Sequence, residues 1–232
     1  MGRLRFADEG DRMMEFLERS AKMRPSMTAT EISEALEPFL GPDFQLSAGQ
    51  LSSVQTYLEL LLKWNSKINL TAIREPREII TRHFGESFFA ARHLPIQFEQ
   101  TAMDIGAGAG FPGLPLKIWN HELSLSLIES NHRKATFLRE AVRALNFSKV
   151  DVVISRAEDV RAQADLVTVR AVENFERILP VARRLTKTSG RIVLLIGAAQ
   201  IGAVEAILSD VKWEPGLPIP GSDTRILLVG VV

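Results

Sequence analysis

Met103–Gly113 reads MDIGAGAGFPG, in which an acidic residue closes an apolar run and leads into alternating glycines. The pattern predicts a strand that turns into a nucleotide-binding loop. Gly106, Gly108 and Gly110 tolerate positive φ and carry no Cβ, so a ligand can approach their backbone N–H groups closely. Pro112 suits the first turn of a following helix, where no N–H donor is needed.

Two carboxylates flank this loop in the sequence. Asp104 ends the strand before the loop, where it can accept hydrogen bonds from loop amides or from a cationic ligand group. Glu129 ends the alternating segment 123–128, at a spacing of about 20 residues where an acidic side chain binds the hydroxyls of an adenosine ribose. The pair therefore predicts a cofactor that contains adenosine.

Three interpretations of the loop remain. Gly108-x-Gly110-x-x-Gly113 satisfies the dinucleotide fingerprint, which is weak support by itself. Asp104 disfavours it, because a carboxylate would face an approaching pyrophosphate. The glycine frame that starts at Gly106 suits S-adenosylmethionine, whose amino acid end carries a sulfonium cation and no phosphate. The third interpretation is a purely structural turn; the residues favour S-adenosylmethionine.

Composition narrows the class of protein. The chain has 232 residues, 46% hydrophobic and 24% charged, enough for one substantial core and an extra element. It has no cysteine, which excludes disulfides, thiolate metal sites and a cysteine nucleophile; we expect no metal site and a cytoplasmic location. No apolar run approaches the roughly 18 residues of a membrane span, and no signal peptide is expected.

The charges balance, with 28 Lys plus Arg and 28 Asp plus Glu. Nucleic-acid binding would therefore depend on a local basic patch. The residue pattern gives no indication of an oligomer, and we expect a monomer.

The chain divides into three predicted parts. Residues 1–45 form a helical or partly mobile extension. Residues 46–95 form a helical cap, since apolar side chains recur at helical spacing from Leu51 to about 67. Residues 96–232 form an α/β domain, because strands and helices alternate there. The strands are expected at 101–105, 123–128, 150–154, 166–169, 191–196, 211–213 and 225–231, and the clearest helix at 131–145.

This alternation predicts a mostly parallel, seven-stranded sheet covered on both faces. The last two strands lie too close together for a helical crossover, so one of them should be antiparallel. Ligands of such sheets bind at the carboxyl ends of the strands. Those ends carry Asp104, Glu129, Arg156–Glu158 and Arg170–Ala171.

Further motifs accompany the loop, in a fixed order. They are Trp64-Asn65-x-x-x-Asn69-Leu70-Thr71, Arg82-His83, the stretch from Asp104 to Gly113, Leu127-Ile-Glu-Ser130, Phe137-Leu138, Arg156-Ala-Glu158 and Arg170-Ala171. Over about residues 50–200 the chain resembles the bacterial 16S ribosomal RNA guanine-N7 methyltransferases, the glucose-inhibited division protein B family.

The resemblance implies a class I S-adenosylmethionine-dependent methyltransferase fold, which is Rossmann-like. It also implies S-adenosylmethionine as methyl donor and a guanine of 16S ribosomal RNA, in the small ribosomal subunit, as acceptor. Carried over by position, the cofactor contacts would be Gly106, Phe111, Ala157, Glu158 and Arg170, with Glu129 at the ribose.

Two positions depart from the family's pattern. Where the family reads His-x-x-Asp-Ser, this chain has Glu86 as the acid, preceded by Gly85 in a helix-like stretch. Where the family's strand ends in Lys-Gly, this chain has Ile196-Gly197. If that position lies beside the RNA path, the missing lysine weakens a phosphate contact.

Methylation of guanine N7 requires that the base be positioned against the methyl donor, and it requires no proton transfer. N7 has an in-plane lone pair and no proton at neutral pH, so it can attack a methyl sulfonium without a general base. Asn65, Asn69, Arg82 and His83, together with Arg170, are candidate donors to the guanine O6 edge or to a nearby phosphate.

These residues also have structural interpretations. Asn65 and Asn69 are compatible with a helix cap, and Arg82-His83 with a pair at a helix end. The basic residues of the predicted 131–145 helix form either a solvated face or an extension of an RNA-binding surface. The acceptor is open too, since the fold also suits methyltransferases of small molecules or proteins and non-catalytic RNA-binding modules.

Overall fold

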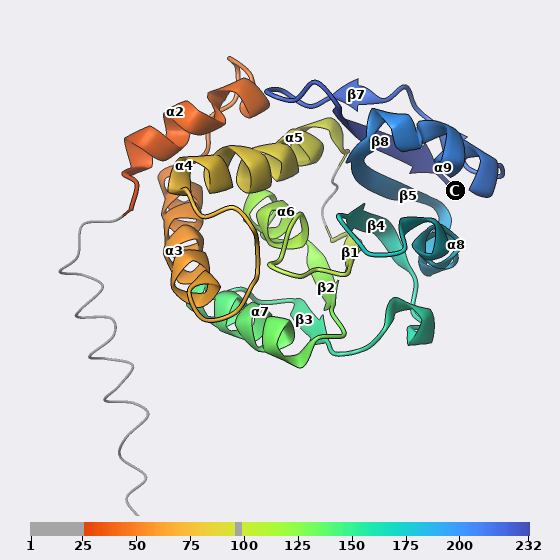
Figure 1. The fold of residues 1–232 in the computed structure, drawn as a ribbon, viewed down its shortest axis with the longest axis horizontal. Helices are drawn as coiled ribbons and strands as arrows, with labels where there is room; N and C mark the ends of the chain where they lie inside the picture. Colours follow the sequence, from red (N-terminus) through yellow and green to blue (C-terminus); the bar gives the residue numbers. More distant parts are fainter. Residues whose placement is uncertain (1–25, 96–98) are drawn as a thin grey trace, which may run out of the picture.

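The computed structural model describes residues 26–95 and 99–232, so most of the predicted 1–45 extension lies outside the described residues. The described chain forms one sheet with helices on both faces (Figure 1). The strands are β1 (Thr101–Ile105), β2 (Ser124–Ile128), β3 (Val150–Val153), β4 (Ala164–Arg170), β5 (Thr186–Gly197), β6 (Lys212–Trp213), β7 (Leu217–Pro218) and β8 (Arg225–Val231).

The sheet has the order β3-β2-β1-β4-β5-β8-β6. The first five strands of this path are parallel, whereas β8 runs antiparallel to β5 and β6. The mostly parallel sheet with one antiparallel strand near the end of the chain is therefore confirmed. The path holds the seven expected strands, and β7, which lies in the short link between the last two of them, adds a two-residue pairing with β8.

Alternation along the strands divides the core between the two faces of the sheet. Val193 and Leu195 of β5 join the core on one face, where α6 (Gly113–Trp119) and α7 (His132–Ala144) pack. Ile192, Leu194 and Ile196 join the core on the other face, under α8 (Phe175–Leu185) and α9 (Ile201–Ile207).

This alternation corrects the expectation for Ile196. Its side chain is only 5% exposed and packs in the α8–α9 core, away from the cap. Side chains alternate between faces with a period of two, so a lysine at this position would start inside an apolar layer rather than beside an RNA path.

The cap covers the α6–α7 side of the sheet (Figure 1). It contains the predicted amphipathic helix, which begins after the N-cap Ser47 and ends at Asn65, two residues before the expected end. A capping box of Thr28 and Glu31 begins a further helix, whose apolar side buries Phe39 in the same core. The elements of the 46–95 cap are α3 (Ala48–Asn65), α4 (Pro76–Ile79), η1 (Ile80–Gly85) and α5 (Glu86–His93), and α2 (Ala29–Leu40), in the described part of the predicted extension, packs against them.

The segment η1 is a π-helix, a widened turn that is common at functional sites. The packing around η1 explains the glycine noted in the sequence. A Cβ added to Gly85 would lie 2.6 Å from the ring of Phe39, so α2 can approach η1 only where a side chain is absent. Gly85, two residues after His83, thus allows the close packing of η1 against Phe39 of α2.

Candidate active site

The candidate site lies at one edge of the sheet, beside η1. The carboxyl ends of β1, β2 and β4 meet there and carry Asp104, Glu129 and Arg170. Because β8 is antiparallel, its first residue, Arg225, reaches the same edge opposite Gly197 of β5. Sequence reasoning considered only the carboxyl ends of strands and missed Arg225, although the predicted antiparallel strand was the signal that could have found it.

The glycines of the loop divide into two pairs. Gly106 and Gly108 have φ of +65° and +56° and lie on its open side, one exposed and the other half-buried. A Cβ on Gly110 would meet the Tyr57 hydroxyl, and one on Gly113 would lie 2.6 Å from Leu127. A Cβ on Gly106 would lie 2.8 Å from Val172, whereas one on Gly108 would have only the Gly106 carbonyl oxygen nearby, at 3.6 Å. The room for a ligand is therefore at Gly108 and on the exposed backbone of Gly106, and Gly110 and Gly113 allow close packing beneath the loop.

Asp104 supports the loop from below. It is 1% exposed; its Oδ2 accepts the Gly113 N–H at 3.0 Å and its Oδ1 accepts the Thr168 hydroxyl at 2.7 Å. Burial raises the pKa of Asp104 to about 6, against the effect of these two hydrogen bonds. Of the two roles considered for Asp104, the structure shows hydrogen bonding to a loop amide.

Glu129 ties the loop to the next helix. Its Oε2 accepts the Gly108 N–H at 2.9 Å and its Oε1 accepts the Asn131 N–H at 2.7 Å. Asn131 in turn caps α7 by accepting the N–H groups of Arg133 and Lys134. A carboxylate oxygen has a second lone pair, so Glu129 retains acceptor capacity for hydroxyl groups in the open part of the loop.

Replacing Glu129 by glutamine should weaken binding of S-adenosylmethionine by about 1–3 kcal/mol. The amide nitrogen cannot accept the bond that one carboxylate oxygen now receives, and the charge that strengthens hydroxyl contacts is lost. Titration calorimetry measures the change. Glu122→Gln, on an exposed ion pair with Lys149, is the matched control; equal affinity of the Glu129 variant and wild type would remove Glu129 from the site.

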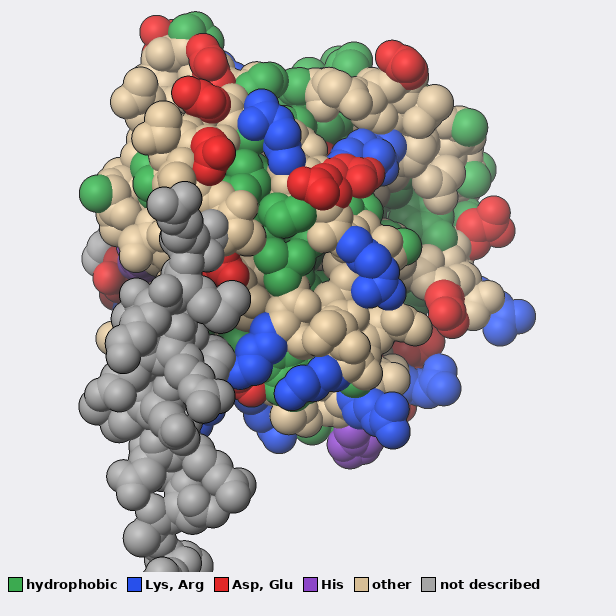
Figure 2. All heavy atoms as spheres, turned by 60° about the vertical axis from the view of Figure 1, so that its left-hand side comes forward, with side chains coloured by type: hydrophobic (Ala, Val, Ile, Leu, Met, Phe, Trp, Pro, Cys, Tyr) green, Lys and Arg blue, Asp and Glu red, His purple; other side chains and the backbone are tan. Residues whose placement is uncertain are grey.

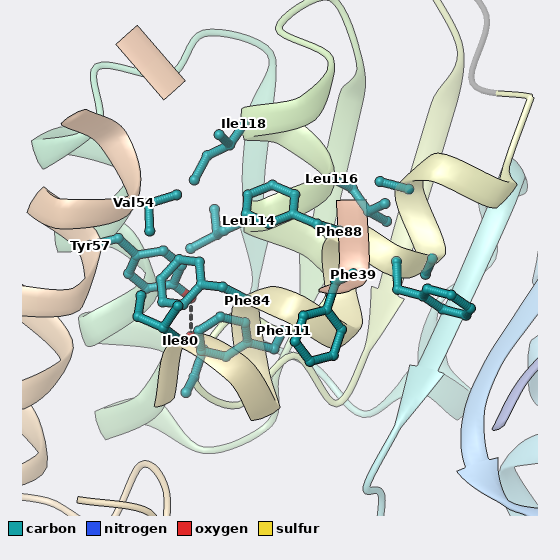
Figure 3. Close-up of a cluster of buried hydrophobic side chains, with 14 of the residues drawn as sticks. Phe39, Val54, Tyr57, Ile80, Phe84, Phe88, Phe111, Leu114, Leu116 and Ile118 are labelled. Atoms are coloured by element: carbon teal, nitrogen blue, oxygen red, sulfur yellow. Dashed lines mark hydrogen bonds between the residues drawn. The ribbon is translucent and has the colours of Figure 1, made fainter. Parts of the chain in front are cut away.

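An aromatic cluster joins the loop to the cap (Figure 3). Phe111 stacks on Tyr57 with ring centroids 5.1 Å apart, and on His83 at 4.9 Å, and its edge meets Phe84. The Tyr57 hydroxyl donates to the Ala109 carbonyl. The Phe111 side chain thus faces the cap, which leaves the backbone of this residue for any cofactor contact. Sequence reasoning missed Tyr57, though a single tyrosine on a buried helix face signals a polar partner.

The two asparagines of the cap differ in environment. Asn65 is 4% exposed, and its amide bonds only to backbone of the segment that follows: it accepts from Leu70 and Thr71 and donates to Thr71 and Ile73. Its polar atoms therefore hold the chain that leaves α3 and do not face a substrate. Asn69 is exposed.

His83 uses both ring nitrogens within the protein. Arg170 Nη2 lies 3.0 Å from Nδ1 and can only donate, so Nδ1 accepts. Nε2 then carries the proton and donates to the Thr71 hydroxyl at 2.7 Å. Burial, aided by the charges of Arg170 and Arg82, lowers the pKa of His83 to about 3. His83 is thus a neutral side chain that links Thr71 and Arg170 by hydrogen bonds and stacks on Phe111. Neither ring nitrogen is directed at a base.

The neutral His83 predicts a pH dependence of stability. An unfolded histidine binds a proton below about pH 6.5, whereas the folded one resists it until about pH 3. The stability advantage of wild type over His83→Gln should be full above pH 6.5 and shrink by up to about 1.4 kcal/mol per pH unit below it. Urea unfolding at a series of pH values tests this, and a constant advantage from pH 7 to pH 4 would contradict it.

Three arginines surround one buried acid beside His83. Glu86 is 1% exposed; Arg225 Nη2 lies 2.5 Å from its Oε1, Arg82 Nε 3.2 Å from the same oxygen, and Arg170 Nη2 3.3 Å from its Oε2. Burial raises the pKa of Glu86, and the charges of Arg170 and Arg82 oppose the rise. Arg170 also donates to the Arg82 carbonyl at 2.7 Å, so its guanidinium is directed at η1.

The segment after β3 is short and lies near the same edge. Ala157 is buried and Glu158 exposed in η2 (Ala157–Asp159), the 3-10 turn that stands between β3 and β4. Arg184 of α8 fixes this turn by donating to the carbonyls of Ala157, Glu158 and Val160. These hydrogen bonds fix the backbone of η2, so it can form a rigid border of a binding site.

The basic side chains of α7 face outward. Arg133, Arg139 and Arg143 are exposed and Lys134 is half-buried. Figure 2 shows Lys and Arg side chains gathered on the lower part of one face, at the height where α7 lies in Figure 1. These side chains reach solvent in the structure. They form either a merely solvated face or an extension of an RNA-binding surface.

Within residues 26–95 and 99–232, no cluster of three or more His, Cys, Asp or Glu side chains could hold a metal ion. No helix in the same part of the chain is long and apolar enough to cross a membrane.

The strand order, and the glycine loop after β1 where that order reverses between β1 and β4, define a class I methyltransferase fold. A SAM-dependent methyltransferase from Aquifex aeolicus superposes with a TM-score of 0.56 at 13% identity, over 67% of this chain and 93% of that one. A ribosomal protein L11 methylase from Lactobacillus delbrueckii gives 0.55 at 13% identity, over 64% and 77%. The expected fold class is confirmed.

Sequence comparison then gives the family. The family model GidB, rRNA small subunit methyltransferase G, matches residues 50–209. Ribosomal RNA small subunit methyltransferase G of Xanthomonas euvesicatoria is 35% identical over 215 residues, 90% of this chain and 99% of the relative. That of Bacillus subtilis is 34% identical over 199 residues, 79% and 83%. The chain belongs to the rRNA small subunit methyltransferase G family, as the resemblance implied.

Proposed function

We propose that this protein transfers the methyl group of S-adenosylmethionine to N7 of a guanine in 16S ribosomal RNA. The observation that carries the proposal is the open glycine loop, held between Asp104 and Glu129, with an arginine cluster directly beside it. The relatives from Xanthomonas euvesicatoria and Bacillus subtilis are named as methyltransferases of small-subunit ribosomal RNA. These names do not specify the methylated atom, and guanine N7 is proposed from the family resemblance.

The loop fits the adenosine cofactor. At Gly106 and Gly108 the backbone has positive φ, Gly106 is exposed and Gly108 half-buried, and Glu129 lies next to Gly108. Backbone N–H groups here would contact the amino acid end, and Glu129 the ribose; Ala157 and Glu158 would border the adenine side. When bound, the cofactor supplies an electrophilic methyl group on a sulfonium.

The acceptor side of the site needs positioning groups and no base. Guanine N7 attacks with a lone pair that carries no proton, so the protein's role is to align it and to exclude water. Arg82, with a side chain 41% exposed, and the exposed Asn69 remain available to touch RNA. Asn65 and His83 act through the segments they hold, and Arg170 fixes η1 of the cap beside the loop.

The arginines favour RNA over a small apolar acceptor. Three guanidiniums around the Glu86 carboxylate make this cluster locally positive, in a chain whose total charge is zero, while Asp104 and Glu129 lie on the loop side. A methyltransferase of small apolar molecules would instead show a neutral or hydrophobic edge. Phosphate binding releases counterions, so RNA affinity falls as salt rises.

Salt dependence and one variant test this proposal. Methyl transfer to small ribosomal subunits should fall as salt is raised, whereas affinity for S-adenosylmethionine hardly changes. Arg82→Ala should reduce transfer to RNA and leave cofactor affinity near that of wild type. Transfer that is independent of salt, or full activity on subunits after Arg82→Ala combined with His83→Ala, would contradict the assignment of RNA as substrate.

A further inference from the structure

Glu86 holds two guanidiniums on a single carboxylate oxygen. Arg82 donates from Nε and Arg225 from Nη2 to Oε1, at 3.2 and 2.5 Å. Oε2 accepts from Arg170, which is committed to η1. Arg82 comes from the cap and Arg225 from the far end of the sheet, so Glu86 brings together two cations that are 143 positions apart in the sequence.

The two guanidiniums keep donors that the described protein does not use. Both Nη atoms of Arg82 are without a hydrogen-bond partner within residues 26–95 and 99–232. Arg225 binds Glu86 through Nη2, and its buried Nε has no partner. The side chains of Arg82 and Arg225 are 41% and 22% exposed, so both reach the surface.

We propose that Arg82 and Arg225, positioned by Glu86, form a receptor for a backbone phosphate of the RNA next to the methylated base. This rests on the proposed function and adds Arg225, which lies outside the family-matched residues 50–209, to the substrate contacts. Arginine is the side chain best suited to phosphate, because its planar fork offers parallel donors to two oxygens. A carboxylate fixed between two arginines keeps both forks in place, and it cancels only one of their two positive charges.

The structure also explains the longer acid at position 86. Its carboxylate reaches Arg82 on the preceding turn and, across the site, Arg225 of β8. Arg225 pairs with Gly197 and lies on the face of the sheet that the cap covers. Ile196 lies on the opposite face, in the core under α8 and α9. The cation expected from the family's lysine is thus supplied on the RNA side by Arg225.

An oxyanion at this cluster could come from the RNA backbone or from the carboxylate of S-adenosylmethionine, and the experiment separates the two. Arg225→Gln, Arg225→Lys and the control Arg183→Gln are compared in steady-state methylation of small ribosomal subunits. Arg183 of α8 is matched because it is a surface arginine that pairs with Asp210. Cofactor affinity and melting temperature are measured in parallel.

We expect Arg225→Gln to raise KM for subunits about tenfold to hundredfold, with kcat near wild type, and to make the slope of log KM against log salt shallower by about one. Arg225→Lys should recover part of the loss, and Arg183→Gln should match wild type. If Arg225→Gln left KM unchanged, or weakened cofactor binding instead of RNA binding, the proposed phosphate receptor would be wrong. Absence of transfer by the wild type would instead refute the proposed function.

Glu86 is tested by a double-variant cycle. If Glu86 acts by positioning Arg225, then Arg225→Gln should raise KM much less in a Glu86→Gln background than in wild type. A structural role alone would lower the melting temperature without this coupling. Equal effects of Arg225→Gln in both backgrounds would overturn the positioning role of Glu86.

Discussion

Replacing Gly106 by arginine is expected to abolish binding of S-adenosylmethionine. Gly106 has φ of +65°, and a Cβ there would lie 2.8 Å from Cγ1 of Val172. A side chain must therefore strain the backbone and push against Val172, and an arginine would also fill the open side of the loop with a long cation. Both effects act where the cofactor's amino acid end would lie.

Titration calorimetry with S-adenosylmethionine tests this prediction. Gly202→Arg is the matched control, because Gly202 lies on α9 with negative φ and no heavy atom within 4 Å of its added Cβ. That variant should bind the cofactor like wild type. Binding by Gly106→Arg at wild-type affinity would place the cofactor elsewhere, and wild-type binding of NADH in place of S-adenosylmethionine would restore the dinucleotide interpretation.

Replacing Arg170 by methionine should lower the free energy of unfolding by about 3–5 kcal/mol. The side chain is 14% exposed, and its Nη2 donates to the Arg82 carbonyl and to His83 Nδ1 and binds Glu86. Methionine fills similar space but leaves these buried acceptors without their donor. The loss should appear as a lower midpoint of urea unfolding.

Arg183→Met is the control for Arg170, since its ion pair with Asp210 is exposed and should contribute about 0–1 kcal/mol. A change in the Arg170 variant no larger than in this control would show that the bonds around η1 contribute little to stability. The account then would have to assign Arg170 a role in ligand binding alone.

The parts of the fold that the sequence predicted are those set by local pattern. Period-two alternation located the strands, and the short link before Arg225 predicted the antiparallel strand that β8 forms with β5. The glycines and acids of the loop were also local signals, and the structure shows Asp104 and Glu129 bonded to the amides of Gly113 and Gly108.

The remaining features depend on contacts between distant segments. A residue type shows that Asn65 or His83 can donate, but not that backbone and Arg170 occupy their polar atoms. The expectation for Ile196 was wrong because a motif position does not specify a face of the sheet. Glu86 was noted as a departure, yet its three arginine partners come from η1, β4 and β8, and only the folded chain brings them together.

The position of a transferred methyl group distinguishes the proposed RNA substrate from every alternative. Small ribosomal subunits that lack the modification are incubated with the protein and S-adenosylmethionine carrying a labelled methyl group, and the label is then located. We expect the label in 16S ribosomal RNA, at N7 of a single guanine. Label on a ribosomal protein or a small molecule, or none on the RNA while the protein binds the cofactor, would contradict it.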